Sequence, residues 1–92
     1  MKLVWSAKAS KRRDEIFDYI ALDNPRTALW LDEQFSLGAK RVGEFPLSGR
    51  KGRVSGTRET IVHENYILVY EVQVDTIVIL TVHHAAQQYP PE

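Results

Sequence analysis

The sequence predicts a small α+β domain with the element order β-α-α-β-β-β, in which a helical hairpin packs on a small, mainly antiparallel sheet. Three observations predict this class. A chain of 92 residues has room for a single core, so we treat residues 1–92 as one domain. Apolar residues recur at helical spacing in the first half of the chain and at strand spacing in the second. Hydrophobic residues make up 43% and charged residues 26% of the chain, as in an ordinary globular domain.

The first elements are a short strand, expected over Lys2–Trp5, and a helix expected from Ala7 to Leu22. Positions three or four residues apart define the face of this helix that turns toward the core. They are Ala9, Arg13, Ile16 and Ile20. The run Asp23-Asn24-Pro25 then breaks the chain.

A second helix should begin directly after this break. Asn24 is a good N-cap and Pro25 suits the first helical position, while Gly43 ends the periodic pattern. The expected core face is again spaced by three or four residues: Ala28, Leu31, Phe35, Ala39 and Val42. Two helices joined by so short a break form an antiparallel hairpin.

The second half of the chain predicts a three-stranded antiparallel meander. The segment Leu47–Gly52 is rich in glycine and positive charge, which indicates a loop. Three segments rich in Val, Ile, Thr and Tyr follow it as strands: Thr57–His63, Tyr66–Gln73 and Thr76–His83. The short connections between them suit tight hairpins.

Both faces of the central strand are apolar. Leu68 and Tyr70 point to one side, and Ile67 and Val69 point to the other. A sheet covered on one side only would alternate apolar and polar residues instead. We therefore expect the second face to be covered, either by the C-terminal tail of the chain or by a bound partner.

The charges are balanced in total but segregated along the chain. Twelve Lys and Arg match twelve Asp and Glu. Between Lys40 and Arg58, six basic residues accompany a single acid, a local charge of +5, so the remainder carries −5. The molecule can therefore present a basic surface while neutral overall, and zero net charge also favours self-association or a charged partner.

Several classes of function are excluded or disfavoured by composition. The sequence has no cysteine, which excludes disulfides and thiolate chemistry. The longest uninterrupted apolar run, Ile77 to Leu80, is far shorter than the roughly 20 residues that span a bilayer. No apolar segment typical of a secretory signal follows Met1. We expect a cytoplasmic protein with no membrane partner.

Four cations stand close together at the end of the basic segment. They are Arg50, Lys51, Arg53 and Arg58. Loop and strand could together bind a polyanionic chain through phosphate contacts, although an ordinary solvated loop is the alternative. Arg58 differs from the others because it lies in mid-strand, where a long cation must face a wet groove or pair with a carboxylate.

A second polar cluster stands at the C-terminus: His83, His84, Gln87, Gln88 and Tyr89. His and Tyr can donate and accept protons, so with nearby cations they could cleave RNA by attack of the 2′-hydroxyl without a metal. If the strand runs through the pair, His83 and His84 point to opposite faces, and only one can serve a given site. A structural role is the alternative for each histidine, including His63, and the spacing of the three matches no usual metal site.

Three blocks occur in a characteristic order along the chain: Gly52–Glu59, His63–Val72 and Ile79–Pro90. Together with the N-terminal strand and helical hairpin, they resemble the RelE/ParE superfamily of toxins from bacterial type II toxin-antitoxin modules. The resemblance covers essentially the whole chain. It implies a growth-inhibiting toxin, without cofactor or metal, that forms a hetero-oligomer with a cognate antitoxin. An antitoxin helix or strand would then cover the second face of the sheet, with Ile67, Val69 and Tyr66 as its expected contacts.

The superfamily divides into two functions. RelE-type members cleave mRNA in the ribosomal A site, whereas ParE-type members share the fold and poison DNA gyrase. Carried over by position, the nuclease reading assigns phosphate binding to Arg50, Lys51 and Arg53, charge stabilisation to Arg58, and acid or base chemistry to His84 or Tyr89.

The C-terminal block departs from the nuclease pattern. Related nucleases commonly carry arginine before the aromatic-Pro ending, where this chain has Ala86 and Gln87. A missing cation removes a stabiliser of the transition state that the nuclease mechanism needs. The residues of the three blocks also resemble those of ParE-type members more closely. We therefore expect a toxin that inhibits gyrase by binding, with ribosome-dependent mRNA cleavage as the alternative.

Overall fold

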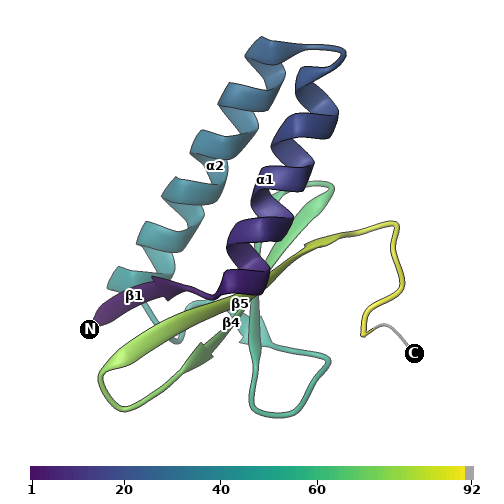
Figure 1. The fold of residues 1–92 in the computed structure, drawn as a ribbon. Coiled ribbons are helices and arrows are strands. Elements are labelled where there is room, and N and C mark those ends of the chain that lie inside the picture. Colours follow the sequence, from purple (N-terminus) through teal and green to yellow (C-terminus); the bar gives the residue numbers. More distant parts are fainter. Residues whose placement is uncertain (91–92) are drawn as a thin grey trace.

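The computed structural model describes residues 1–90 and confirms the predicted order of two helices and a sheet, with one additional short strand. The elements along the chain are β1 (Lys2–Trp5), α1 (Ala7–Ala21), α2 (Pro25–Glu44), β2 (Arg50–Lys51), β3 (Arg58–His63), β4 (Tyr66–Val72) and β5 (Thr76–His84). Figure 1 shows the helical hairpin standing on one side of the strands, with the C-terminal segment on the far side of α1. The expected element ends agree with the observed ones within a residue, as end fraying allows.

The five strands form one sheet in the order β1-β5-β4-β3-β2. β1 pairs in parallel with β5, and every other pair is antiparallel. The expectation of an uninterrupted loop over Leu47–Gly52 is wrong at β2, which pairs Arg50 with Glu59 and Lys51 with Arg58. Two residues are too few to show a strand period in the sequence, so only pairing with β3 defines this strand.

Each helix begins at a side-chain cap. Asn24 accepts a hydrogen bond from the Thr27 N–H at 3.1 Å, as its position before Pro25 predicted. Ser6 caps α1 by accepting from the Ala9 N–H at 3.0 Å, and its hydroxyl also donates to the Leu80 carbonyl at 3.1 Å. The start of α1 is thereby fixed to β5.

An ion pair fixes the two helices to each other. Arg13 donates to both carboxylate oxygens of Asp32, at 2.6 and 3.0 Å, and to the Ser36 hydroxyl. The Arg13 guanidinium also lies 4.7 Å from the centre of the Trp5 ring. Arg13 therefore occupies the inner helical stripe without an unpaired charge, because Asp32 and Trp5 surround it.

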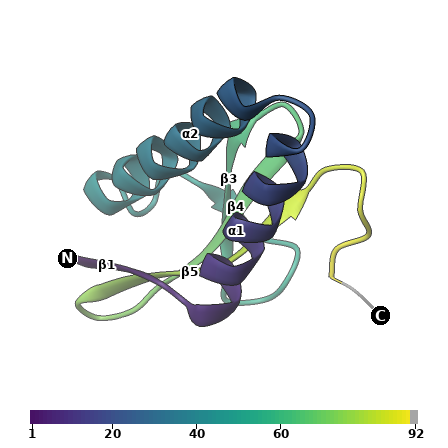
Figure 2. The same cartoon turned by 45° about the horizontal axis from the view of Figure 1, so that its top comes forward.

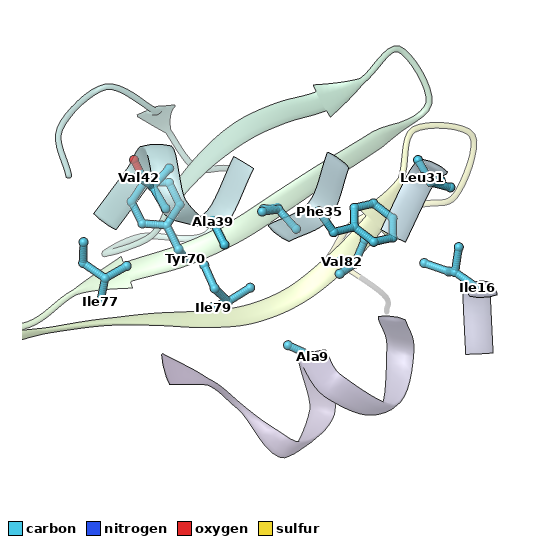
Figure 3. Close-up of a cluster of buried hydrophobic side chains, with 11 residues drawn as sticks. Ala9, Ile16, Leu31, Phe35, Ala39, Val42, Tyr70, Ile77, Ile79 and Val82 are labelled. Carbon is cyan, nitrogen blue, oxygen red and sulfur yellow. The ribbon is translucent and has the colours of Figure 1, made fainter. Parts of the chain in front are cut away.

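The core lies between the hairpin and the sheet (Figure 3). All five residues predicted for the inner face of α2 are buried, and four of them form one cluster with buried side chains of β4 and β5: Leu31, Phe35, Ala39 and Val42. Tyr70 is buried with its hydroxyl satisfied, since it donates to the Pro46 carbonyl at 2.8 Å and accepts from the Gly49 N–H at 3.0 Å. The segment that leads into β2 is thus attached to the core.

No helix within residues 1–90 combines the length and the apolar character that a membrane span needs.

Candidate functional site

The basic loop, defined here as residues 47–57, is held by its own backbone. The Gly52 N–H donates to the Thr57 carbonyl at 2.8 Å, and the Thr57 hydroxyl donates to the Val54 carbonyl at 2.6 Å. Gly56 turns the chain with a φ of 84°, a conformation that glycine adopts without steric cost. Residues 52–57 of the basic loop are therefore an ordered turn between β2 and β3.

Glu59 is the buried centre of this region, with only 2% of its surface exposed. One carboxylate oxygen accepts from Arg50 Nη2 at 3.0 Å, and the other accepts from the Arg53 backbone N–H at 3.0 Å. The Arg53 Nε lies 3.6 Å from the carboxylate as well. Two of the four predicted phosphate-binding cations thus share one buried anion, which neutralises part of their charge.

The pKa of Glu59 reflects this competition. Burial alone would raise the pKa, because a carboxylate is poorly stabilised away from water. Hydrogen bonds from Arg53 and Arg50, together with the charges of both arginines, outweigh burial and place the pKa of Glu59 below its ordinary value. Glu59 is consequently ionised at neutral pH and acts as the counter-ion of the basic loop.

Lys51 and Arg58 lie apart from the Glu59 cluster. They form a cross-strand pair and line an open cavity of about 410 Å³ together with the hydroxyl side chains Ser55 and Thr57. Arg58 lines this cavity, which agrees with the first of the two settings expected for it, a wet groove. Its guanidinium also donates to the Gly49 carbonyl at 2.7 Å. The carboxylate pairing considered for Arg58 belongs instead to Arg50 and Arg53.

The C-terminal tail, residues 85–90, packs onto the Glu59 cluster where Tyr89 meets His83 of β5. The ring centres of these two residues are 4.9 Å apart, and the Arg53 guanidinium lies 5.9 Å from the centre of the Tyr89 ring. Arg53 Nη1 is 3.5 Å from His83 Nε2, close enough to donate when that nitrogen carries no proton. Loop, β3 and tail therefore meet at one point.

Burial perturbs the titration of both aromatic groups in this cluster. It lowers the pKa of His83 below the ordinary value, and the charge of Arg53 acts in the same direction. Burial likewise raises the pKa of Tyr89, with the negative charge of Glu59 adding to the effect. His83 is therefore neutral near pH 7, while Tyr89 keeps its proton.

His84 points away from this cluster, as the alternation along β5 predicted. Its ring centre lies 5.0 Å from that of Tyr66, edge to face, and its Nδ1 accepts a hydrogen bond from the Ala86 N–H at 3.0 Å. Burial raises the pKa of Tyr66 above its ordinary value. This pair lies beside α1, in a cavity that Ile16 and Tyr19 also line.

The three residues to which the nuclease reading assigned chemistry do not converge. Arg58 is opposite Tyr70 in the sheet, whereas His84 is opposite Tyr66, four residues away along β4 or roughly 13 Å at strand spacing. Tyr89 contacts His83 rather than His84. The structure therefore brings Tyr89 together with Arg53 and His83, and separates it from His84.

The residues expected to contact an antitoxin are only partly accessible. Ile67 and Val69 are buried, so they form no exposed apolar surface, whereas Tyr66 is half-buried. Val69 is paired with Glu59 and Ile67 with His83, so these four side chains share one face of the sheet. Because Arg53 and Tyr89 contact Glu59 and His83, the chain's own loop and tail lie on this face. The covering by the C-terminal tail that we considered is therefore present, and the basic loop adds to it.

His63, the remaining candidate histidine, packs against an aromatic side chain. His63 lies at the end of β3, where its ring meets Trp30 edge to face with 5.4 Å between ring centres. Among residues 1–90, no group of three or more His, Asp or Glu side chains is placed to hold a metal ion.

Glu59 and His83 are the site residues whose roles we did not predict from the sequence. A signal for Glu59 was present, because it directly follows Arg58 in a strand whose neighbouring loop holds the other cations. Nothing in the sequence distinguished His83 from His84, since only the position of the folded tail decides which of them meets Tyr89.

The fold matches solved structures from bacterial toxin-antitoxin systems. The ParDE toxin-antitoxin system of P. aeruginosa provides a solved structure with a TM-score of 0.82 and 24% identity, covering 91% of this chain and 95% of that one. The YoeB/ParE toxin from Agrobacterium tumefaciens matches with a TM-score of 0.63 and 17% identity, over 91% of this chain and 98% of that one. At these identities the structural matches define the class by its fold: a hairpin on a mixed sheet, shared by ParE and YoeB toxins.

Sequence comparison narrows this class to a family. The profile described as "ParE toxin of type II toxin-antitoxin system, parDE" matches residues 3–89, and the chain therefore belongs to the ParE toxin family. A relative from Sinorhizobium fredii, named "Putative toxin Y4kP", is 38% identical over 90 residues, which are 97% of this chain and 93% of the relative. Membership in this family implies an antitoxin as partner.

Proposed function

We propose that this toxin arrests growth by binding DNA gyrase, and that a cognate antitoxin relieves the arrest. The observation that carries the proposal is the dispersal of the nuclease residues, because Arg58, His84 and Tyr89 lie in three different surroundings. Catalysis needs its groups within hydrogen-bond reach of one reacting centre. Binding a large target needs only a shaped and charged surface, which this chain retains.

Within that surface, we assign target contact chiefly to Lys51 and Arg58. They line the open cavity beside the basic loop, and Lys51 is exposed. Arg50 and Arg53 are turned toward Glu59 and hold the loop in place. An anionic surface of the target, from protein or from DNA bound to it, suits this cavity because cations and hydroxyl groups both face it.

A supercoiling assay with purified gyrase tests the proposal. We expect the purified toxin to inhibit supercoiling or to trap cleaved DNA, and we expect Lys51→Glu to raise the inhibitory concentration about tenfold, a loss of about 1.4 kcal/mol. Lys40→Glu is the matched control, because Lys40 is an exposed lysine of α2 outside the cavity. Full gyrase activity at saturating toxin would contradict the proposal.

One observation favours the alternative, a ribosome-dependent mRNA endonuclease. Arg53, His83 and Tyr89 do assemble, and a neutral histidine beside a protonated tyrosine could serve as base and acid. Purified translation reactions separate the two functions. Cleavage of mRNA at codon boundaries, present only with ribosomes and abolished by His83→Gln with Tyr89→Phe, would establish the nuclease and overturn the gyrase proposal.

A further inference from the structure

α2 carries a line of exposed residues on the side that faces away from the core. The line consists of six residues spaced alternately by four and three positions: Arg26, Trp30, Glu33, Leu37, Lys40 and Glu44. The buried residues of the same helix lie on its opposite face. Figure 2 shows α2 along the upper edge of the molecule, with α1 and the strands beneath it. We call these six exposed residues the α2 seam.

The spacing of the α2 seam is the one with which a helix packs along a second helix. Alternating steps of four and three residues keep a single line of side chains facing a partner over several turns. From Arg26 to Glu44 the seam is about 27 Å long, at 1.5 Å per residue. All six residues are exposed, so nothing within residues 1–90 covers this line.

The seam contains two large apolar side chains. Trp30 has 47% of its surface exposed and Leu37 has 52%. Burial of such side chains against a partner is favourable because it removes apolar area from water. The edge-to-face contact with His63 already holds the Trp30 ring, which lowers the entropy that Trp30 would lose on binding.

The charged side chains of the seam have no partner in the free chain. Within residues 1–90, the ion pairs of Arg13 and of Glu59 include none of them. Their signs alternate along the helix, in the order positive, negative, positive, negative: Arg26, Glu33, Lys40 and Glu44. The seam is therefore neutral in total, as the whole chain is, and no net charge opposes the approach of a second copy.

The α2 seam is complementary to an antiparallel copy of itself. When two α2 helices lie head to tail, the first seam residue faces the last, the second faces the fifth and the third faces the fourth. The facing pairs, each present twice, are Arg26 with Glu44, Trp30 with Lys40, and Glu33 with Leu37. The first pair joins opposite charges, and the second places a cation on an aromatic ring. In a parallel arrangement each charge would instead face its own copy and be repelled.

We infer that this toxin self-associates through the α2 seam, with two copies packing their α2 helices antiparallel about a twofold axis. Only one helix of each copy contributes, so the interface is small and we expect a dissociation constant of about 0.1 mM. At the low micromolar concentrations of an inhibition or unfolding assay the chain is then a monomer. The inference does not rest on the proposed function, because the cavity that Lys51 and Arg58 line includes no residue of α2.

Sedimentation equilibrium of the purified toxin between about 10 µM and about 1 mM tests the inference. Arg26→Glu should raise the dissociation constant at least about tenfold, because both symmetric pairs become repulsive. Adding Glu44→Arg reverses the pair and should restore the original value. Both substitutions suit the helix ends, an acid in the first turn and a base in the last, so folding is retained. Lys11→Glu, at an exposed lysine of α1, is the control and should dimerise as the original toxin does.

Cysteine crosslinking tests the antiparallel arrangement separately, since the chain has no cysteine of its own. A disulfide requires the two Cα atoms to lie within about 7 Å. In the antiparallel pair, position 26 faces position 44 and lies about 27 Å from its own copy. A mixture of Arg26→Cys and Glu44→Cys should therefore form a mixed disulfide on oxidation, whereas neither variant alone should crosslink.

A toxin that stays monomeric at 1 mM would overturn the inference, as would a dimer that Arg26→Glu leaves unchanged. Crosslinking of Arg26→Cys with itself would refute the antiparallel arrangement. If the toxin does not dimerise and Arg26→Glu escapes neutralisation by the antitoxin, the seam binds the antitoxin instead and the inference is wrong. Inhibition of gyrase by a toxin that remains monomeric would leave the proposed function standing.

Discussion

On the helix side of the sheet, Phe35, Leu68 and Tyr70 are buried among apolar neighbours, whereas the buried side chains of the opposite side include Glu59 and His83. The first side is stabilised by the hydrophobic effect, which depends on area and not on direction. The second side depends on a carboxylate shared by two arginines and on aromatic contacts from the tail. Apolar packing on the helix side therefore stabilises the domain. The polar and aromatic contacts on the opposite side fix the arrangement of the loop and tail at the surface.

The largest effect is expected from the helix side. Phe35→Ala should lower the free energy of unfolding by about 3–5 kcal/mol, because it leaves a cavity where α2 meets the sheet. Urea denaturation followed by circular dichroism measures the loss. Leu37→Ala, at an exposed position of the same helix, should change stability by no more than about 0.5 kcal/mol. Phe35→Leu leaves a smaller cavity and should remain folded. Equal losses of unfolding free energy for Phe35→Ala and Leu37→Ala would contradict the comparison.

On the opposite side, Glu59→Gln should cost about 1–3 kcal/mol, less than Phe35→Ala, because the arginines that lose their partner are half-exposed and can turn to water. Its larger consequence should be local, with faster hydrogen exchange of the Arg53 N–H. Glu71→Gln, at a less buried carboxylate of β4, is the control and should leave that exchange rate unchanged. An unchanged rate in Glu59→Gln itself would mean that the loop does not depend on the buried anion.

Gly49 lies between Tyr70 of the helix side and Glu59 of the opposite side, so a substitution there tests how closely the two are packed. A β-carbon there would lie 2.8 Å from the Glu59 carbonyl oxygen and also against the Tyr70 hydroxyl. Gly49→Ala should therefore destabilise the domain by about 1–3 kcal/mol. Gly43→Ala should instead stabilise it by about 0.5–1 kcal/mol, since Gly43 lies in α2 with open space around it. Thermal denaturation distinguishes the two, and equal shifts of Tm would contradict this assignment.

The smallest effect is expected in the pH dependence of stability. His83 has a lowered pKa in the folded chain, so its contribution to stability is complete above the unfolded value of 6.5 and falls as the pH drops below it. Glu59, also lowered, should add a second loss below its reference value of 4.5. Urea midpoints between pH 7.5 and 3.5 measure both losses. His83→Gln should reduce the first and Glu59→Gln the second; identical profiles for all three proteins would refute the assignment.

Local signals predicted most of the fold. Asn24 and Pro25 marked the start of α2, and the spacing from Ala28 to Val42 identified its buried face before any contact was known. β2 was not predicted because it has only two residues, and only their pairing with β3 defines them as a strand. The helix side was predictable because periodicity reports burial; the opposite side was not, because the position of Glu59 among the arginines depends on how loop and tail fold over the sheet.

The candidate site was predictable in composition but not in arrangement. Every cation proposed from the sequence lies near the basic loop, yet the sequence could not separate Arg50 and Arg53, which face Glu59, from Lys51 and Arg58, which face a cavity. Strand alternation placed His83 and His84 on opposite faces correctly. Strand alternation could not predict against which face of the sheet the tail packs.

The parallel pairing of β1 with β5 also determines when the sheet can close. Lys2 is in register with Thr76, and Ser6 bonds to Leu80, so β1 has its sheet partner only after more than 70 further residues have been synthesised. Such a closure is long-range and slow relative to hairpin formation. The sheet cannot close on a nascent chain until β5 has left the ribosome, so a chain at that earlier stage also lacks the tail contacts beside Glu59.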